Sequence, residues 1–417
     1  MKKFLLKSLL VFLCAFGLFG NHGRVFGDEL DQELRKVEPL DGTRSAPKSA
    51  TSGDVRRETE RLTSELRGLP FKTPVKYKVI DRSQLKQILI KKVKEQFTDE
   101  ELRGYNRSLA AIGLIPEGTD LLKVLLSLYG EQVAAFYEPA EPALYTFTGE
   151  SWTSDLHKML LSHELTHALQ DQNYSLKTFP LDVKDNDDLA LATSALVEGD
   201  ATLLMTRYYA ENADPTRMLG DLTSMLGQDT KQLLQSPPYL QEMLLFPYQE
   251  GNQFATALFM AGGTSALNEA FRHRPVSTQQ ILHPEKFLHD RRDPQAVALT
   301  RIQSKDWQLI GNNVLGEFGI RCLLEPSAGS FEAVRAAQGW NGDRYHVYER
   351  GKNGPTGLVW VTVWENADAA KEFEDAYKLV AELRKGTLKV DRSGSRVTVR
   401  QSTDAAFFAL SDSLVAR

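Results

Sequence analysis

Cysteine is nearly absent from this 417-residue chain, which contains only Cys14 and Cys322. Cys14 lies in an apolar N-terminal run that we expect to be removed, so the mature chain would keep Cys322 alone and could form no intramolecular disulfide. Leu13 precedes Cys14 where a lipoprotein signal has a small residue, which argues against lipidation. The fold must therefore depend on its hydrophobic core or on a bound metal.

An excess of basic residues is also missing, since the formal net charge is −5. A nucleic-acid-binding domain usually carries a basic surface, so we predict no nucleic-acid partner. The sequence has no G-x-S-x-G, Walker A or C-x-x-C pattern, and thus no local sign of a serine nucleophile, a phosphate loop or a thiol redox pair.

The N-terminus has the layout of a secretory signal peptide. Three lysines precede an apolar run from Leu9 to Phe19, and Val25-Phe26-Gly27 offers a cleavage site after Gly27. We predict that residues 1–27 are removed and that the protein is exported, to the periplasm or the medium. The alternative is an uncleaved membrane anchor, although the run of about 12 residues is short for a span of about 20. No later segment is expected to cross a membrane.

The remainder divides into a linker and two folded parts. Residues 28–53 are polar and contain Pro39, Gly42 and Pro47, which is typical of a flexible linker. We assign residues 54–300 to a mainly helical domain with a short edge sheet and residues 301–417 to a small α+β domain. The fold class predicted from the sequence is therefore α+β.

Hydrophobic periodicity supports these assignments. In the first part, we expect helices at about 85–97, 98–113, 121–129, 154–172 and 188–210, a hairpin of strands 133–137 and 143–147, and further helical segments to about 290, interrupted at Pro237-Pro238, Pro247 and Pro275. Thr98 and Glu101 form a capping box that starts the second helix. In the second part, we expect strands at 345–349 and 358–364, a helix at 368–383 and a hairpin around Gly394.

The strongest chemical signal is His163-Glu164-Leu165-Thr166-His167. On a helix, residues i and i+4 lie on one face, so both imidazoles can bind a single Zn²⁺ at about 2.0–2.1 Å. Glu164 lies beside them, where it can reach the water that the metal activates rather than the metal itself. The surrounding residues, Leu160, Leu161 and Leu169 among them, are apolar, so the helix is expected to be buried and its histidines to need a partner.

Catalytic zinc has three protein ligands and an open fourth position. Glu198 follows His167 by 31 residues and lies in a small, apolar stretch, Ala195 to Ala201, which predicts a buried and engaged carboxylate. Asp200 competes for this role. We prefer Glu198, because on a helix Asp200 would point about 200° away from it. One Zn²⁺ per chain is therefore expected.

These motifs resemble the gluzincin branch of zinc metallopeptidases, which includes thermolysin-like and aminopeptidase-like enzymes. HELTH followed by a glutamate on a second helix carries the resemblance, and Pro247-Tyr248-Gln249-Glu250-Gly251 is similar to the PYxxG segment of the aminopeptidase-like members. The resemblance implies that the hydroxyl of Tyr248 stabilises the oxyanion of the tetrahedral intermediate. Tyr208 and Tyr209 are the substitutes if Tyr248 faces away.

The chain departs from the gluzincin pattern at several positions. Val197 and Thr202 replace the asparagine and aspartate that flank the third ligand in thermolysin-like enzymes, so no hydrogen-bond partner for His163 is identified. Asp171, one turn beyond His167, is either such a partner or a solvated acid. The exopeptidase motif GxMEN is absent, and only Glu138 matches it, in a strand that could pair with an extended substrate.

We therefore predict an exported zinc metallopeptidase that acts on a peptide or protein, with Glu164 as the general base. Two alternatives from other classes stay open. One is a pseudopeptidase that binds zinc without turnover, and the other is a zinc amidase that acts on cell-wall material.

Overall fold

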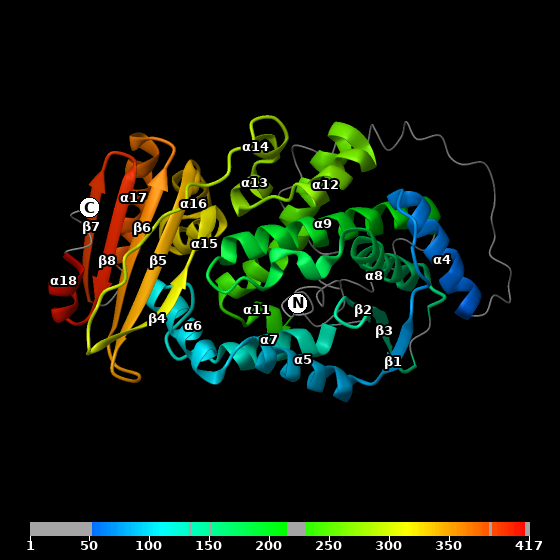
Figure 1. The fold of residues 1–417 in the computed structure, drawn as a ribbon, viewed down its shortest axis with the longest axis horizontal. Helices are drawn as coiled ribbons and strands as arrows, with labels where there is room; N and C mark the ends of the chain where they lie inside the picture. Colours follow the sequence, from blue (N-terminus) through cyan, green and yellow to red (C-terminus); the bar gives the residue numbers. More distant parts are fainter. Residues whose placement is uncertain (1–51, 133–134, 150–151, 215–230, 383–385, 413–417) are drawn as a thin grey trace.

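The computed structural model describes residues 52–132, 135–149, 152–214, 231–382 and 386–412. A group of helices forms the centre of the molecule, with a three-stranded sheet beside them at one end and a five-stranded sheet with its own helices at the other (Figure 1). The predicted α+β class is thus confirmed. The predicted leader and nearly all of the predicted linker lie outside the described residues.

The helical part follows the hydrophobic pattern closely. Thr98 and Glu101 form the expected reciprocal cap, and Gly113, with φ of 90°, ends that helix. A helix begins at Ser52, so the linker ends earlier than residue 53. The helices are α4 (Ser52–Arg67), α5 (Arg82–Gln96), α6 (Asp99–Ile112), α7 (Leu121–Gln132), α8 (Asp155–Tyr174), α9 (Asp187–Asn212), α11 (Lys231–Leu234), α12 (Pro238–Arg272), α13 (Thr278–Leu282) and α14 (Pro284–Leu288).

The expected interruption at Pro247 is wrong. Pro247 lies inside α12, and the irregular backbone comes later, at Gly262 and Gly263. A proline inside a helix removes one hydrogen bond and crowds the preceding turn, so its sequence signal is a break. Here α12 packs along α9 over much of its length, and this tertiary contact keeps the helix continuous. The interruption at Pro237-Pro238 is confirmed, since Pro238 is the first helical residue.

The smaller sheet has the order β1-β3-β2, which makes β2 an edge strand. Its strands are β1 (Tyr77–Ile80), β2 (Ala135–Glu138) and β3 (Ala143–Phe147). The hairpin of β2 and β3 was predicted, whereas β1 was not. β1 has four residues and pairs in parallel with β3. This contact joins residues distant in the sequence, so no local sequence pattern predicts it.

The C-terminal part is an antiparallel sheet in the order β4-β5-β6-β8-β7 with helices against it. The two hairpins and the long helix were predicted, but β4 and the two helices that follow it were not. The elements are β4 (Trp307–Asn313), α15 (Gly316–Ala328), α16 (Ser330–Ala337), β5 (Trp340–Arg350), β6 (Thr356–Trp364), α17 (Ala367–Glu382), β7 (Thr387–Ser393), β8 (Arg396–Ser402) and α18 (Ala406–Ser411). One hydrophobic cluster joins both parts, from Leu109 to Val399.

Helix α9 runs through the middle of the helical part. By length and composition it is apolar enough to cross a membrane, which corrects the expectation that no segment after the leader is. However, 83% of its apolar window is buried inside the protein, as in a core helix. Its apolar character therefore serves packing on all sides, because α8, α12 and α4 all contact it.

Two glycines allow α9 and α12 to approach closely. A Cβ atom on Gly199 would collide with the backbone carbonyl of Gly251, and one on Gly251 would collide with the carbonyl of Ala195. Gly199 directly follows Glu198, and Gly251 lies three residues after Tyr248 on the same face of its helix. The contact therefore sets the distance between the two predicted site residues.

Gly199→Ala tests this packing. Because the new methyl group meets backbone rather than a movable side chain, we expect a loss of stability of about 1–3 kcal/mol or more, measured by urea unfolding. Gly262→Ala is the control, since its Cβ would approach only the Cβ of Ala266, at 3.2 Å. Equal losses in the two variants would contradict a special role for the α9–α12 contact.

Candidate metal centre

The predicted ligands meet at the contact between α8 and α9. Ser154 caps α8, with its hydroxyl accepting from the backbone N–H of His157, and Asn186 caps α9 in the same way. His163 and His167 project from α8 toward Glu198 on α9, and all three side chains are fully buried. These are the described residues that form a cluster of potential metal ligands.

The distances within this cluster fit a tetrahedral ion. The Nε2 atoms of His163 and His167 are 3.1 Å apart, and each lies 3.3 Å from Oε2 of Glu198. An ion that binds nitrogen and oxygen at about 2.0–2.1 Å in tetrahedral geometry separates its ligand atoms by about 3.3 Å. The donor set of two imidazoles and one carboxylate is also one that Zn²⁺ prefers.

Unsatisfied atoms in the cluster support the same fit. Among the described residues, Oε1 of Glu164 and Oε1 of Glu198 are buried without a hydrogen-bond partner. Burying polar atoms without partners costs free energy, so their concentration at one place indicates that a ligand belongs there.

Burial and mutual charge set the protonation of the cluster without a metal. Burial lowers the pKa of His163 to about 4. Burial also opposes the charged form of His167, but the carboxylate of Glu198 outweighs it and raises that pKa to about 9. For Glu198, burial favours the neutral form, and the imidazoles reverse this and lower its pKa. At neutral pH, His167 and Glu198 thus form a buried ion pair whose proton a bound cation would displace.

Glu164 lies beside the cluster and is held by the edge strand β2. Its Oε2 accepts a hydrogen bond of 2.7 Å from the backbone N–H of Tyr137, while Oε1 has no partner among the described residues. Burial raises the pKa of Glu164 to about 8. The contact to β2 is a feature that the sequence did not predict, because it joins residues of two separate elements.

The ring of Tyr248 stacks beside the ring of His163. Their rings are 6.3 Å apart between centroids, with an angle of 27° between the planes. The substitutes lie elsewhere, since Tyr208 follows Glu198 by ten residues, about 15 Å along the helix axis. The hydroxyl of Tyr208 contacts Thr59 of α4, and Tyr209 packs beside Met205. Of the three tyrosines, the structure brings the ring of Tyr248 beside the cluster of His163, His167 and Glu198.

Asp200 is not part of the ligand cluster. Its carboxylate forms an ion pair with Arg67 at 2.9 Å and accepts a hydrogen bond of 2.8 Å from Nε2 of Gln170. Gln170 in turn places Oε1 2.9 Å from Nδ1 of His167. Gln170 was not predicted from the sequence, although its position three residues after His167 on one helical face was an available signal. No feature of the sequence connected Arg67 with the predicted ligands.

Two further candidates are engaged away from the ligands. Asp171 is half-buried and accepts hydrogen bonds from the hydroxyl of Tyr137 and the backbone N–H of Leu176, so it is not a partner of a ligand histidine. Glu138 is buried and paired with Lys92. The ammonium group of Lys92 therefore neutralises the carboxylate of Glu138, the residue that matched the exopeptidase motif.

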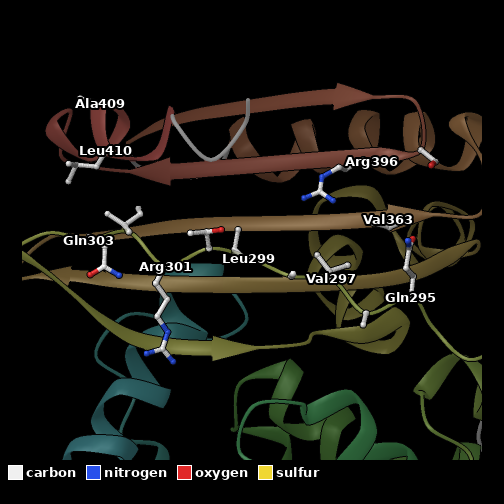
Figure 2. Close-up of a pocket in the computed structure, with 14 residues that line it drawn as sticks. Gln295, Val297, Leu299, Arg301, Gln303, Val363, Arg396, Ala409 and Leu410 are labelled. Carbon is white, nitrogen blue, oxygen red and sulfur yellow. The ribbon is translucent and has the colours of Figure 1, made fainter. Parts of the chain in front are cut away.

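A large surface cavity lies far from this chemistry, over the C-terminal sheet. Its volume is about 860 Å³, and residues 295–303 form one wall, opposite Arg396 of β8 and Leu410 of α18 (Figure 2). The residues that line it include no histidine, cysteine or carboxylate. The described residues of this cavity therefore offer no metal ligand and no general base.

Comparisons with known proteins do not assign an activity. A family described as "Domain of unknown function (DUF8575)" matches residues 307–414, about a quarter of the chain and outside the metal centre. No curated protein matches. A crystal structure from Chloroflexus aurantiacus, of a candidate hydrolase with a novel fold, shares 17% identity with a TM-score of 0.40, over 63% of this chain and 97% of that chain. This similarity is too low to carry an argument.

Glu198→Ala tests the ligand assignment. Removing one of three ligands should weaken Zn²⁺ binding by more than the about 10- to 100-fold typical of residues that only orient a ligand. Competition with a chelating dye measures the loss. Asp200→Ala should cost less, and Asp171→Asn, on the ligand helix but without contact to the cluster, should cost nothing. A larger loss for Asp200→Ala than for Glu198→Ala would make Asp200 the third ligand.

Proposed function

We propose that the chain is a zinc-dependent peptidase, exported after removal of residues 1–27. The observation that carries this proposal is the buried triangle of His163, His167 and Glu198, with Glu164 beside it on the same helix. The gluzincin resemblance adds Tyr248, whose ring lies 6.3 Å from that of His163 between centroids. Peptides or proteins are the proposed substrates.

His163, His167 and Glu198 would hold the ion. A zinc ion bound there would supply Lewis-acid polarisation of a water molecule and of the scissile carbonyl. Oε1 of Glu164 is the oxygen left to take a proton from the attacking water, because Oε2 is occupied by the N–H of Tyr137. Burial raises the pKa of Glu164 to about 8 in the absence of a metal, and a cation bound beside it would lower that pKa and keep the carboxylate able to accept this proton.

The proton balance closes within these residues. The water oxygen forms a bond to the carbonyl carbon, and its proton moves to Glu164. Glu164 then passes the proton to the nitrogen of the leaving amine as the C–N bond breaks. Between these two steps the former carbonyl oxygen carries a negative charge, and the hydroxyl of Tyr248 donates a hydrogen bond to it.

Complete burial of the site favours a second candidate, a pseudopeptidase with a structural zinc ion. Structural zinc sites are closed, whereas catalytic sites keep a position open to substrate. The side chains of His163, His167 and Glu198 have no exposure, and Glu164 is 1% exposed. The intact general base argues for the peptidase, because a structural site has no use for it.

Glu164→Gln separates the two candidates. Glutamine keeps an oxygen that can accept from Tyr137 but cannot take up a proton, so activity on a peptide library should fall by at least about a hundredfold. Zinc content, measured by atomic absorption, should stay near one per chain. Loss of zinc would make Glu164 a ligand. Wild-type protein that binds zinc but cleaves no more than Glu164→Gln would be the pseudopeptidase.

Tyr248→Phe tests the oxyanion role. The hydrogen bond forms in the transition state, so kcat should fall by about a hundred- to a thousandfold while KM and zinc content stay nearly constant. Tyr208→Phe serves as the control, since that hydroxyl contacts Thr59 away from the metal centre. A slow Tyr208→Phe enzyme beside an unchanged Tyr248→Phe enzyme would reverse the assignment.

A further inference from the structure

A chain of buried polar contacts leads from the proposed metal centre to helix α4. Nδ1 of His167 lies 2.9 Å from Oε1 of Gln170, whose Nε2 donates to Oδ2 of Asp200 at 2.8 Å. Asp200 pairs with Arg67 at 2.9 Å, and Arg67 also donates to Asn268 at 2.8 Å. Arg67 is the last residue of α4 and stands 133 positions before Asp200 in the sequence.

The surroundings of Gln170 decide which way its amide points. Its Nε2 faces two acceptors, the carboxylate of Asp200 and, at 3.0 Å, the backbone carbonyl of Val197. A flipped amide would place its oxygen against both acceptors and leave three buried oxygens without a proton between them. Oε1 of Gln170 therefore faces His167.

The orientation of the Gln170 amide determines which ring nitrogen of His167 carries a proton. An amide oxygen can only accept, so Nδ1 of His167 must be the atom that donates to it. In the neutral ring the single proton is therefore on Nδ1, and the lone pair of Nε2, the atom 3.3 Å from Glu198, is left to bind an ion. A ligating histidine is commonly oriented in this way by a partner on its other nitrogen.

We propose that Arg67 and Asp200 are positioning residues of the metal centre: they fix the amide of Gln170, which presents Nε2 of His167 to the ion. Arg67 holds the carboxylate of Asp200 in place, because its Nε donates to Oδ2, the same oxygen that accepts from Gln170. The inference rests on the proposed metal site and is independent of peptidase activity. It makes α4, which lies about 100 residues before the ligands, a part of the site.

Stability alone does not account for the Arg67–Asp200 pair. The two side chains are 2% and 1% exposed. A buried ion pair loses hydration that its mutual attraction barely restores, and apolar residues of similar volume often replace such a pair without loss of stability. The distinctive property of this pair is its connection through Gln170 to His167.

The double variant Arg67→Met/Asp200→Leu uses this difference as a test. It removes both charges together, so neither remains buried alone, and it should melt close to the wild type. Gln170 loses one of the two acceptors that orient it, and Zn²⁺ affinity should fall by about 10- to 100-fold in a chelating-dye competition. Arg103→Met is the control. It removes a guanidinium from the ion pair with Glu349, which Arg107 still neutralises, and should leave the affinity unchanged.

Gln170→Met provides a second route that keeps the Arg67–Asp200 pair intact. It should lower Zn²⁺ affinity by a similar factor even if the double variant fails to fold. Wild-type affinity in a folded double variant would overturn the positioning role and leave the proposed peptidase untouched, and so would wild-type affinity in Gln170→Met. Wild-type protein that binds no Zn²⁺ would overturn the metal site and this inference together.

Discussion

The burial of ionisable side chains between α8 and α9 is the constraint on which the rest of the structure depends. His163, His167 and Glu198 are fully buried. Each would cost several kcal/mol without a compensating partner, more than the marginal stability of a domain tolerates repeatedly. The compensation observed is a triangle of donor atoms 3.1–3.3 Å apart, held by two apolar helices that leave the side chains no alternative direction.

The surrounding elements maintain this triangle from several sides. The glycine contact between α9 and α12 brings Tyr248 within reach of His163, since any larger side chain at Gly199 or Gly251 would separate the helices. The edge strand β2 supplies the N–H that holds Glu164. The site is therefore a meeting point of elements, and none of them could form it alone.

Part of this fold could be predicted from local patterns in the sequence. The α+β class, the two ligand helices and the C-terminal hairpins followed from hydrophobic periods of 3.6 and 2. The predicted interruption at Pro247 was wrong, because proline breaks an isolated helix but does not break α12, which is packed along α9. Strands β1 and β4 were not predicted, because each is stabilised by pairing with a strand distant in the sequence.

The sequence by itself determined the pair His163 and His167 and the neighbouring Glu164, because helical geometry fixes the relation of residues three and four positions apart. It also favoured Glu198 over Asp200 through the same geometry. Only the tertiary structure decided what Asp200 does instead and which tyrosine approaches the cluster. It also showed that Arg67 reaches the site through Gln170. These contacts join helices that are far apart along the chain, and the packing of a shared core sets their distances.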